Sequence, residues 1–379
     1  MQPLGSSGGT VPRNESDNSF GLRLVLLAGL LYTFFVGLDL MGLSFKLFGK
    51  GLAETLIEQT SNPFVGLFIG ILATTLVQSS STTTSMTVGL VAGGALTIEG
   101  AIPIIMGANI GTSVTNTMVA LGHMTRPEEF RRAFAGATVH DFFNWMTVLI
   151  LLPLEISTGY LARTAGALQS VIAEVGGTKL ANPLKEIVRP VANWVSGTLG
   201  DSGALTLAAG IFFVFLALKF LVDVLRSVFS QRAERLLHKT LFRSAIAAMG
   251  AGCLMTAAVQ SSSITTSVVI PLVGAGVVSL EQLFPFTIGA NIGTTVTAML
   301  AALASGSPAA ITVALSHFLF NISGTLLVYP IKAIRNIPLS LARALGDIAV
   351  RNRFLAGLYI IVMFYLIPLL MLFVAGIFD

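Results

Sequence analysis

A 42-residue segment occurs twice in the chain, and this duplication limits the possible folds more than any other feature. Residues 74–115 and 256–297 align without a gap at a constant offset of 182, and 22 of the 42 positions are identical. Such self-similarity indicates a duplicated structural unit. We expect repeat units at 20–155 and 204–353, joined by a linker at 156–203. A disordered polar tail at 1–19 precedes them, and a C-terminal transmembrane helix at 354–379 follows them.

The composition indicates a membrane protein. Charged residues make up 11% of the chain and hydrophobic residues 54%, whereas a soluble domain has about 25% charged residues. Several apolar runs reach the roughly 20 residues that cross a bilayer as a helix, without the alternation of a transmembrane barrel. The sequence therefore predicts an all-α polytopic membrane protein, with seven crossings near 20–48, 101–121, 133–155, 204–228, 285–303, 308–330 and 354–378.

The basic residues between these spans predict the orientation of the two units. Lys and Arg in short loops remain on the cytoplasmic side. The loop before the first repeated segment, 49–61, holds one basic and two acidic residues, whereas its counterpart, 231–243, holds four basic residues and one acidic residue. After the segment the order reverses, because three arginines follow the first copy and the counterpart loop 304–310 is uncharged. We therefore expect inverted-topology repeats, a cytoplasmic N-terminus, an extracellular linker and an outside C-terminus.

The sequence lacks the signatures of a nucleic-acid-binding protein, an ATP-driven pump, a metalloenzyme and a serine hydrolase. The net charge of +4 is explained by these topology-setting loops, so no nucleic-acid partner is expected. The chain has a single cysteine, Cys253, which excludes an intramolecular disulfide. No Walker A motif is present, no metal spacing of Cys, His or carboxylate occurs, and no nucleophile elbow surrounds the serines. The sequence therefore predicts neither an enzyme nor an ATP-driven pump.

Two polar motifs recur inside the apolar regions of the repeats. The first is QSSS, at 78–81 and 260–263, and the second is GANIGT, at 107–112 and 289–294. Polar runs are costly in hydrocarbon unless they are satisfied internally, and interrupted apolar segments at matching places in two halves indicate a transporter's binding site. A single such run more often packs helices, but two matched copies favour a site. We expect the QSSS regions, near 63–95 and 244–278, to form helical hairpins or broken helices.

The residue types in these motifs suit an anion together with a hard cation. Serine hydroxyls and the free N–H groups of a half-helix can hold an oxyanion without Lys or Arg. Neutral amide and hydroxyl oxygens suit sodium. The candidate anion ligands are Ser79, Ser80, Ser81, Ser261, Ser262 and Ser263. The candidate sodium ligands are Gln78, Gln260, Asn291, Thr294, Thr297, Asn109, Thr112 and Thr115, and no other metal is expected.

At these residues the chain resembles the type II sodium-dependent phosphate cotransporter family. The resemblance is carried by both QSSS elements and by residues 103–117, 130–145, 151–155 and 317–324, and it covers most of residues 20–370. It implies phosphate at the paired serines and sodium near both glutamines and the second GANIGT. It also implies sodium-coupled symport of phosphate into the cell by alternating access, with sodium as co-substrate and no other cofactor. The partners would be phosphate, sodium and the lipid bilayer, and a homodimer is left open.

Some features separate this chain from the family pattern. Ala290 stands where the family often has a sodium-binding serine, and residues 91–95 lack the aspartate that binds a further sodium in some members. The short linker and the lone cysteine suggest a bacterial member in the inner membrane. Two alternatives remain from the residues alone: a sodium-coupled transporter of another oxyanion or a small organic acid, and a phosphate sensor that does not transport. Asp39 and Lys46, inside the first apolar run, are also candidates for function.

Overall fold

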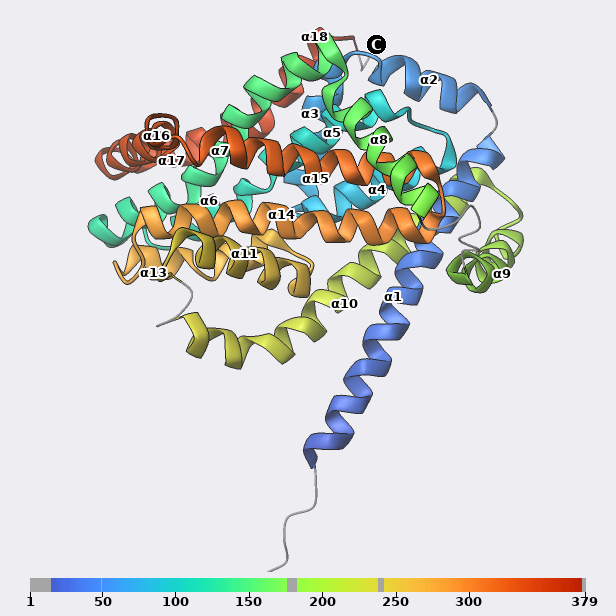
Figure 1. Ribbon diagram of the computed structural model, residues 1–379, viewed down its shortest axis with the longest axis horizontal. Helices are drawn as coiled ribbons and strands as arrows, with labels where there is room; N and C mark the ends of the chain where they lie inside the picture. The colour runs from blue at the N-terminus through green and yellow to red at the C-terminus, as the bar shows by residue number, and fades with distance from the viewer. Residues whose placement is uncertain (1–14, 49, 176–182, 238–241, 377–379) are drawn as a thin grey trace, which may run out of the picture.

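The computed structural model describes residues 15–48, 50–175, 183–237 and 242–376, and these residues form helices joined by short connections without a strand (Figure 1). The first half contains α1 (Glu15–Phe48), α2 (Lys50–Thr60), α3 (Pro63–Val77), α4 (Ser80–Gly93), α5 (Ile98–Gly111), α6 (Ser113–Leu121), α7 (Pro127–Thr158), α8 (Tyr160–Val175) and α9 (Pro183–Thr198). The second half contains α10 (Gly203–Leu237), α11 (Ala245–Val259), α12 (Ser262–Ser267), α13 (Ile270–Gly274), α14 (Leu280–Ser305), α15 (Pro308–Val328), α16 (Lys332–Arg351), α17 (Arg353–Ile361), the π-helical segment η1 (Val362–Leu366) and α18 (Ile367–Val374).

Within the described residues, seven helical segments are long and apolar enough to cross a membrane, as many as the sequence predicts. They are Val25–Phe48, Ile98–Leu121, Pro127–Thr158, Gly203–Phe220, Leu280–Ser305, Pro308–Val328 and Arg353–Val374. An eighth candidate span is a pair of helices, Glu54–Thr60 and Pro63–Val77, bent by 100° at their junction. The predicted polar tail falls mostly on residues 1–14, outside the described residues, and its last five positions belong to α1.

The helices of the two repeats begin at matching side-chain caps. Asn62 accepts a hydrogen bond from the backbone N–H of Phe64 and precedes Pro63, so α3 starts there. Ser244 accepts from the backbone N–H of Ala247 and starts α11 in the same way. Ser279 forms a complete capping box with Gln282 at the start of α14. Local sequence therefore explains where these helices begin.

The GANIGT motif serves close packing of helices. α5 lies against α3, and α14 lies against α11. A Cβ atom on Gly107 would overlap the carbonyl oxygen of Leu67, and one on Gly289 would overlap that of Met249. α14 runs through its GANIGT without a break, whereas in the first copy α5 ends at Gly111 and α6 begins at Ser113. In both copies the first glycine of the motif allows two backbones to touch.

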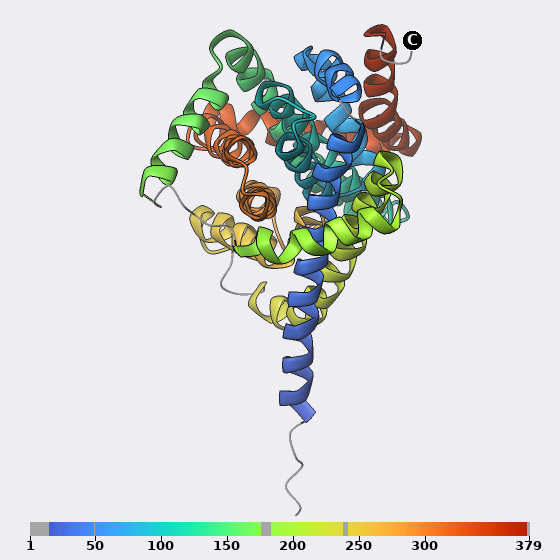
Figure 2. The ribbon, with the colours of Figure 1, turned by 90° about the vertical axis from the view of Figure 1, so that its right-hand side faces the viewer.

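The two halves of the chain are interleaved rather than separate. α1 packs along α10, where Gly37 and Gly210 face each other's backbones, and α14 lies beside α15 across the middle of the molecule (Figures 1 and 2). One buried apolar cluster joins Val88 of α4, Val214 of α10 and Ala298 of α14. This interleaving brings segments from both repeats to one place. The linker contributes α8 and α9, with residues 176–182 outside the described residues.

Candidate functional site

Both QSSS motifs begin with a glutamine in the left-handed backbone conformation. Gln78 has φ 55° and ψ 29°, and Gln260 has φ 57° and ψ 23°. Among the described non-glycine residues only Asp201 also has a positive φ. This conformation is unfavourable for residues other than glycine and is retained mainly where surrounding structure enforces it, often at functional sites. Each glutamine ends one helix and turns the chain into the next, so both QSSS elements interrupt a helix as predicted.

The serine after each glutamine caps the following helix. Ser79 Oγ accepts from the backbone N–H of Thr82 at 3.2 Å, and Ser261 Oγ accepts from that of Ile264 at 3.4 Å. The backbone angles of the two serines are nearly the same, φ −150° and −152°. The duplicated sequence therefore folds into a duplicated turn, and the two turns are in contact because Ser81 Oγ donates to the Gln260 carbonyl oxygen at 2.8 Å.

A cavity of about 400 Å³ opens between the two turns. We call it the QSSS cavity. It is lined by Val77, Gln78, Ser79, Ser81, Thr82, Thr115, Phe215, Leu218, Lys219, Gln260, Ser261, Ser263 and Ile264. Equivalent residues of the two repeats, 182 positions apart in the sequence, thus line the same cavity. Their hydroxyl and amide groups border one shared space. The cavity's hydroxyl and amide groups, set among apolar side chains, and its volume can accommodate a small hydrated ion or oxyanion.

The structure brings together only part of the predicted anion ligands. Four of the six serines line the QSSS cavity: Ser79, Ser81, Ser261 and Ser263. The middle serines, Ser80 and Ser262, are buried and are not part of its lining. Alternate positions of a helical first turn face different directions, so three consecutive serines cannot all point into one cavity. The role of each serine as a ligand stays a prediction.

The glutamines and their partner threonines differ between the repeats. Thr297 Oγ1 donates to Gln260 Oε1 at 2.7 Å, so this pair is closed. The equivalent pair is open: Gln78 Nε2 faces the Met118 sulfur at 3.6 Å, and the buried Thr115 Oγ1 has no partner among the described residues. Gln78 and Thr115 both line the QSSS cavity. Their two oxygens are therefore available to a cation there.

The asparagines of GANIGT take part in a buried hydrogen-bond network. His140 Nε2 and Asn291 Oδ1 are 2.6 Å apart, Asn291 Nδ2 donates to Asn144 Oδ1 at 2.7 Å, and Asn144 Nδ2 donates to the Asn109 carbonyl oxygen at 2.7 Å. This network joins α7 of the first repeat to α14 of the second. The equivalent residues His317 and Asn321 make no such link, because both His317 ring nitrogens and Asn321 Oδ1 lack partners within the described chain.

The remaining sodium candidates bond within their own helices. Asn109 Nδ2 donates to the Ile105 carbonyl oxygen at 2.9 Å. Thr112 Oγ1 donates to the Ala108 oxygen at 2.9 Å, and Thr294 Oγ1 donates to the Ala290 oxygen at 3.0 Å. These bonds leave the hydroxyl lone pairs as acceptors, but none of the three side chains lines the QSSS cavity.

The one charged residue in the lining of the QSSS cavity is not among the candidate ligands predicted from the motifs. Lys219 is part of the cavity wall, whereas the candidate ligands chosen from the motifs include no Lys or Arg. The available signal was a lone cation within the apolar run 204–225, since ionisable residues inside a membrane segment usually serve function. Lys219 lies about forty positions before the second QSSS, on a separate helix, so the spacing of the motifs does not point to it.

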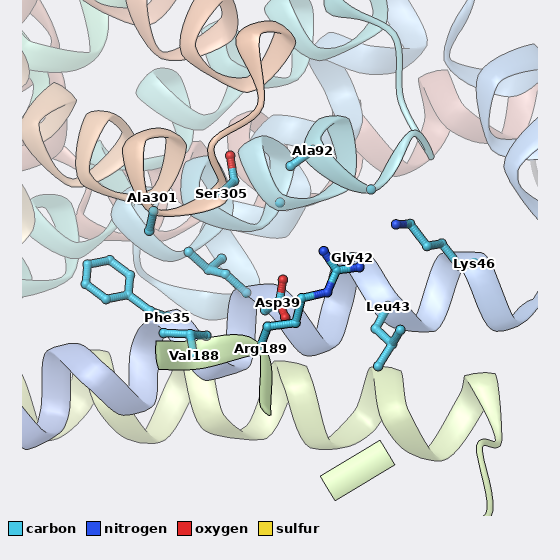
Figure 3. Close-up of a pocket in the computed structure, with 14 residues that line it drawn as sticks. Phe35, Asp39, Gly42, Leu43, Lys46, Ala92, Val188, Arg189, Ala301 and Ser305 are labelled. Carbon is cyan, nitrogen blue, oxygen red and sulfur yellow. The ribbon is translucent and has the colours of Figure 1, made fainter. Parts of the chain in front are cut away.

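A second, smaller cavity of about 70 Å³ contains the other candidates from the first apolar run. Asp39 and Lys46 of α1 line it together with Arg189 of α9 (Figure 3). Its floor is formed by small residues of α4 and α14, including Gly93 and Ala301. These three charged side chains therefore share one cavity between α1, α4, α9 and α14.

The fold and the site are those of a polytopic membrane transporter, with interrupted helices around a polar cavity. The chain belongs to the Na+/Pi-cotransporter family, whose sequence pattern matches residues 33–178 and 212–342. It is 38% identical over 425 residues to sodium-dependent phosphate transport protein 2A of Rattus norvegicus, covering 92% of this chain and 67% of that protein. It is 37% identical over 444 residues to sodium-dependent phosphate transport protein 2B of Homo sapiens, covering 92% and 64%. The chain thus spans about two thirds of the length of these relatives, and no solved structure matches it.

Proposed function

We propose that this protein is a secondary active transporter that carries inorganic phosphate into the cell together with sodium. The observation that carries the proposal is the QSSS cavity, in which the serines of two repeats face each other. Family membership and the names of the relatives, sodium-dependent phosphate transport proteins, support the choice of substrates. In this site Ser79, Ser261 and Ser263 would donate to phosphate oxygens, and Ser81 would do so after releasing the Gln260 carbonyl oxygen.

Sodium would serve as the co-substrate that makes phosphate binding favourable. Bringing an anion into a low-dielectric site costs several kcal/mol unless opposite charge accompanies it. The oxygens of Gln78 and Thr115 are the sodium ligands that we favour, since both residues line the cavity and Thr115 Oγ1 is unpaired within the described chain. Gln260, Thr297 and Asn291 would require a rearrangement that opens the Gln260–Thr297 bond or the Asn291 network. Asn109, Thr112 and Thr294 are not part of the cavity lining.

The experiment that tests this function is uptake of labelled phosphate into proteoliposomes. We expect uptake to fall at least tenfold when external sodium is replaced by choline, because the charge of sodium then no longer offsets that of phosphate. Equal uptake in the two solutions would exclude symport. Competition by sulfate and dicarboxylates tests the alternative substrates, and binding without counterflow would identify a sensor.

We further propose that transport proceeds by alternating access between two inverted repeats, units 20–155 and 204–353. Two observations support two distinct arrangements. The Gln260–Thr297 pair is closed while Gln78 and Thr115 are apart, and His140 is engaged while His317 has no partner in the described chain. In the opposite state we expect the Gln260–Thr297 pair to open and the Gln78–Thr115 pair to close.

The proposed orientation places the N-terminus and the basic clusters inside, and the linker 156–203 and the C-terminus outside. Its support is that basic residues distant in sequence gather at one end of the molecule. Arg131 lies 3.4 Å from Asp347, and Arg343 pairs with Glu281. Together with Arg132, these two arginines line one cavity. Lys239 of the second basic cluster lies outside the described residues.

Cysteine labelling tests this orientation with two positions on one helix. Ser157 and Arg126 flank opposite ends of α7, about 45 Å apart at 1.5 Å per residue, and both are exposed. In a Cys253→Ala background, Ser157→Cys should react with an impermeant thiol reagent added outside cells, and Arg126→Cys should react only after permeabilisation. The opposite pattern would reverse the orientation.

A further inference from the structure

The lining of the QSSS cavity includes one charged side chain, Lys219, which lies on the face of α10 that borders the cavity. Phe215, Leu218 and Lys219 are the three residues of α10 that line the cavity. Their spacing of i, i+3 and i+4 places them on one helical face. The side chain of Lys219 therefore belongs to the face that closes the cavity, not to the opposite face of α10.

The other groups in the lining cannot compensate the charge of an anion. Apart from Lys219, every lining residue is neutral: glutamine, serine, threonine or an apolar side chain. Hydroxyl donors orient an oxyanion but carry no net charge. A lysine in an apolar helix is costly unless it reaches water or a counter-charge, and Lys219 is exposed, with its ammonium 5.8 Å from the centre of the Phe220 ring.

We propose that Lys219 is a phosphate-binding residue, whose ammonium group provides the positive charge that the two serine turns lack. This inference rests on the proposed function, because it assumes that the QSSS cavity holds phosphate. The serines fix the orientation of the anion, and Lys219 sets its affinity and its preference for an anion over neutral solutes of similar size. α10 is thereby part of the binding site and not only a packing partner of α1.

The test compares Lys219→Met, which keeps the length of the side chain without its charge, with Lys219→Arg, which keeps the charge. Proteoliposome uptake is measured as the phosphate KM at saturating sodium and the sodium half-saturation at saturating phosphate. We expect Lys219→Met to raise the phosphate KM about ten- to a hundredfold, the scale of a hydrogen bond to a charged group. Lys219→Arg should stay within about threefold of the native protein. The sodium half-saturation should change less than the phosphate KM in both variants.

Two controls make the outcome decisive. Lys332→Met removes a lysine at the exposed start of α16, away from the cavity, and should leave both parameters unchanged. Should Lys219→Met be too poorly folded for uptake, Lys219→Gln is measured instead, with phosphate-dependent thermal stabilisation in detergent as the readout. A native phosphate KM in Lys219→Met, while Ser263→Ala raises it, would overturn the role of Lys219 and leave the site in place. A native KM in both variants would overturn the proposed site as well.

Discussion

Gly289→Ala should strongly reduce the yield of folded protein, whereas Gly250→Ala should not. A Cβ atom at position 289 would overlap the backbone carbonyl of Met249, and the atoms it meets belong to the rigid backbone of α11. The added methyl group can be accommodated only if α11 and α14 separate along their length. Overpacking typically costs 1–3 kcal/mol, and we expect about 3 kcal/mol here because no flexible side chain can move aside.

Gly250 is the matched control for this substitution. It lies next to Met249 on the same helix, yet a Cβ atom there would meet nothing within 4 Å. Alanine favours a helix by roughly 0.8–1 kcal/mol over glycine, so Gly250→Ala should be neutral or slightly stabilising. The measurement is the monodisperse fraction after size-exclusion chromatography, with the thermal unfolding midpoint in the same detergent. Equal behaviour of the two variants would show that α11 and α14 do not pack as closely as described. Gly107→Ala should repeat the effect of Gly289→Ala in the first repeat.

The second large effect is expected at the serines that face each other across the QSSS cavity. Ser263→Ala removes a hydroxyl from the cavity wall, and Ser81→Ala also removes the bond to the Gln260 carbonyl oxygen. Each lost hydrogen bond to a charged ligand costs roughly 1.5–3 kcal/mol, so each variant should raise the phosphate KM about ten- to a hundredfold. The double variant should raise it by less than the product of the two, because contacts to one shared ligand are coupled.

Ser267→Ala provides the control for the serine variants. Ser267 follows Ser263 by one helical turn, but it donates to the Ile264 carbonyl oxygen at 3.0 Å and does not line the cavity. Its removal should leave the phosphate KM unchanged. Ser80→Ala and Ser262→Ala then show whether the two serines outside the lining are ligands. If the double variant raised the phosphate KM by the full product of the two single effects, one ion held between both turns would be excluded.

The sequence by itself determined where the chain crosses the membrane and where its helices are interrupted. Both properties are local: an apolar run of about 20 residues is a span wherever it occurs, and a polar run within it must find internal partners. The seven predicted spans and the two interruptions at Gln78 and Gln260 therefore agree with the structure. The duplication also predicted that the two turns would be alike, because the same residues meet the same local constraints.

Only the tertiary structure decided which side chains share a space. The direction of a side chain depends on how its helix is rotated and on which helix packs against it, and neither is encoded in a motif. For this reason Ser81 and Ser263 line the QSSS cavity whereas Ser80 and Ser262 do not, and Lys219 enters the cavity from a helix outside both motifs. The same packing turns Asn291 toward His140 and presses Gly289 against α11, because closely packed helices leave each side chain only the room that the neighbouring backbone allows.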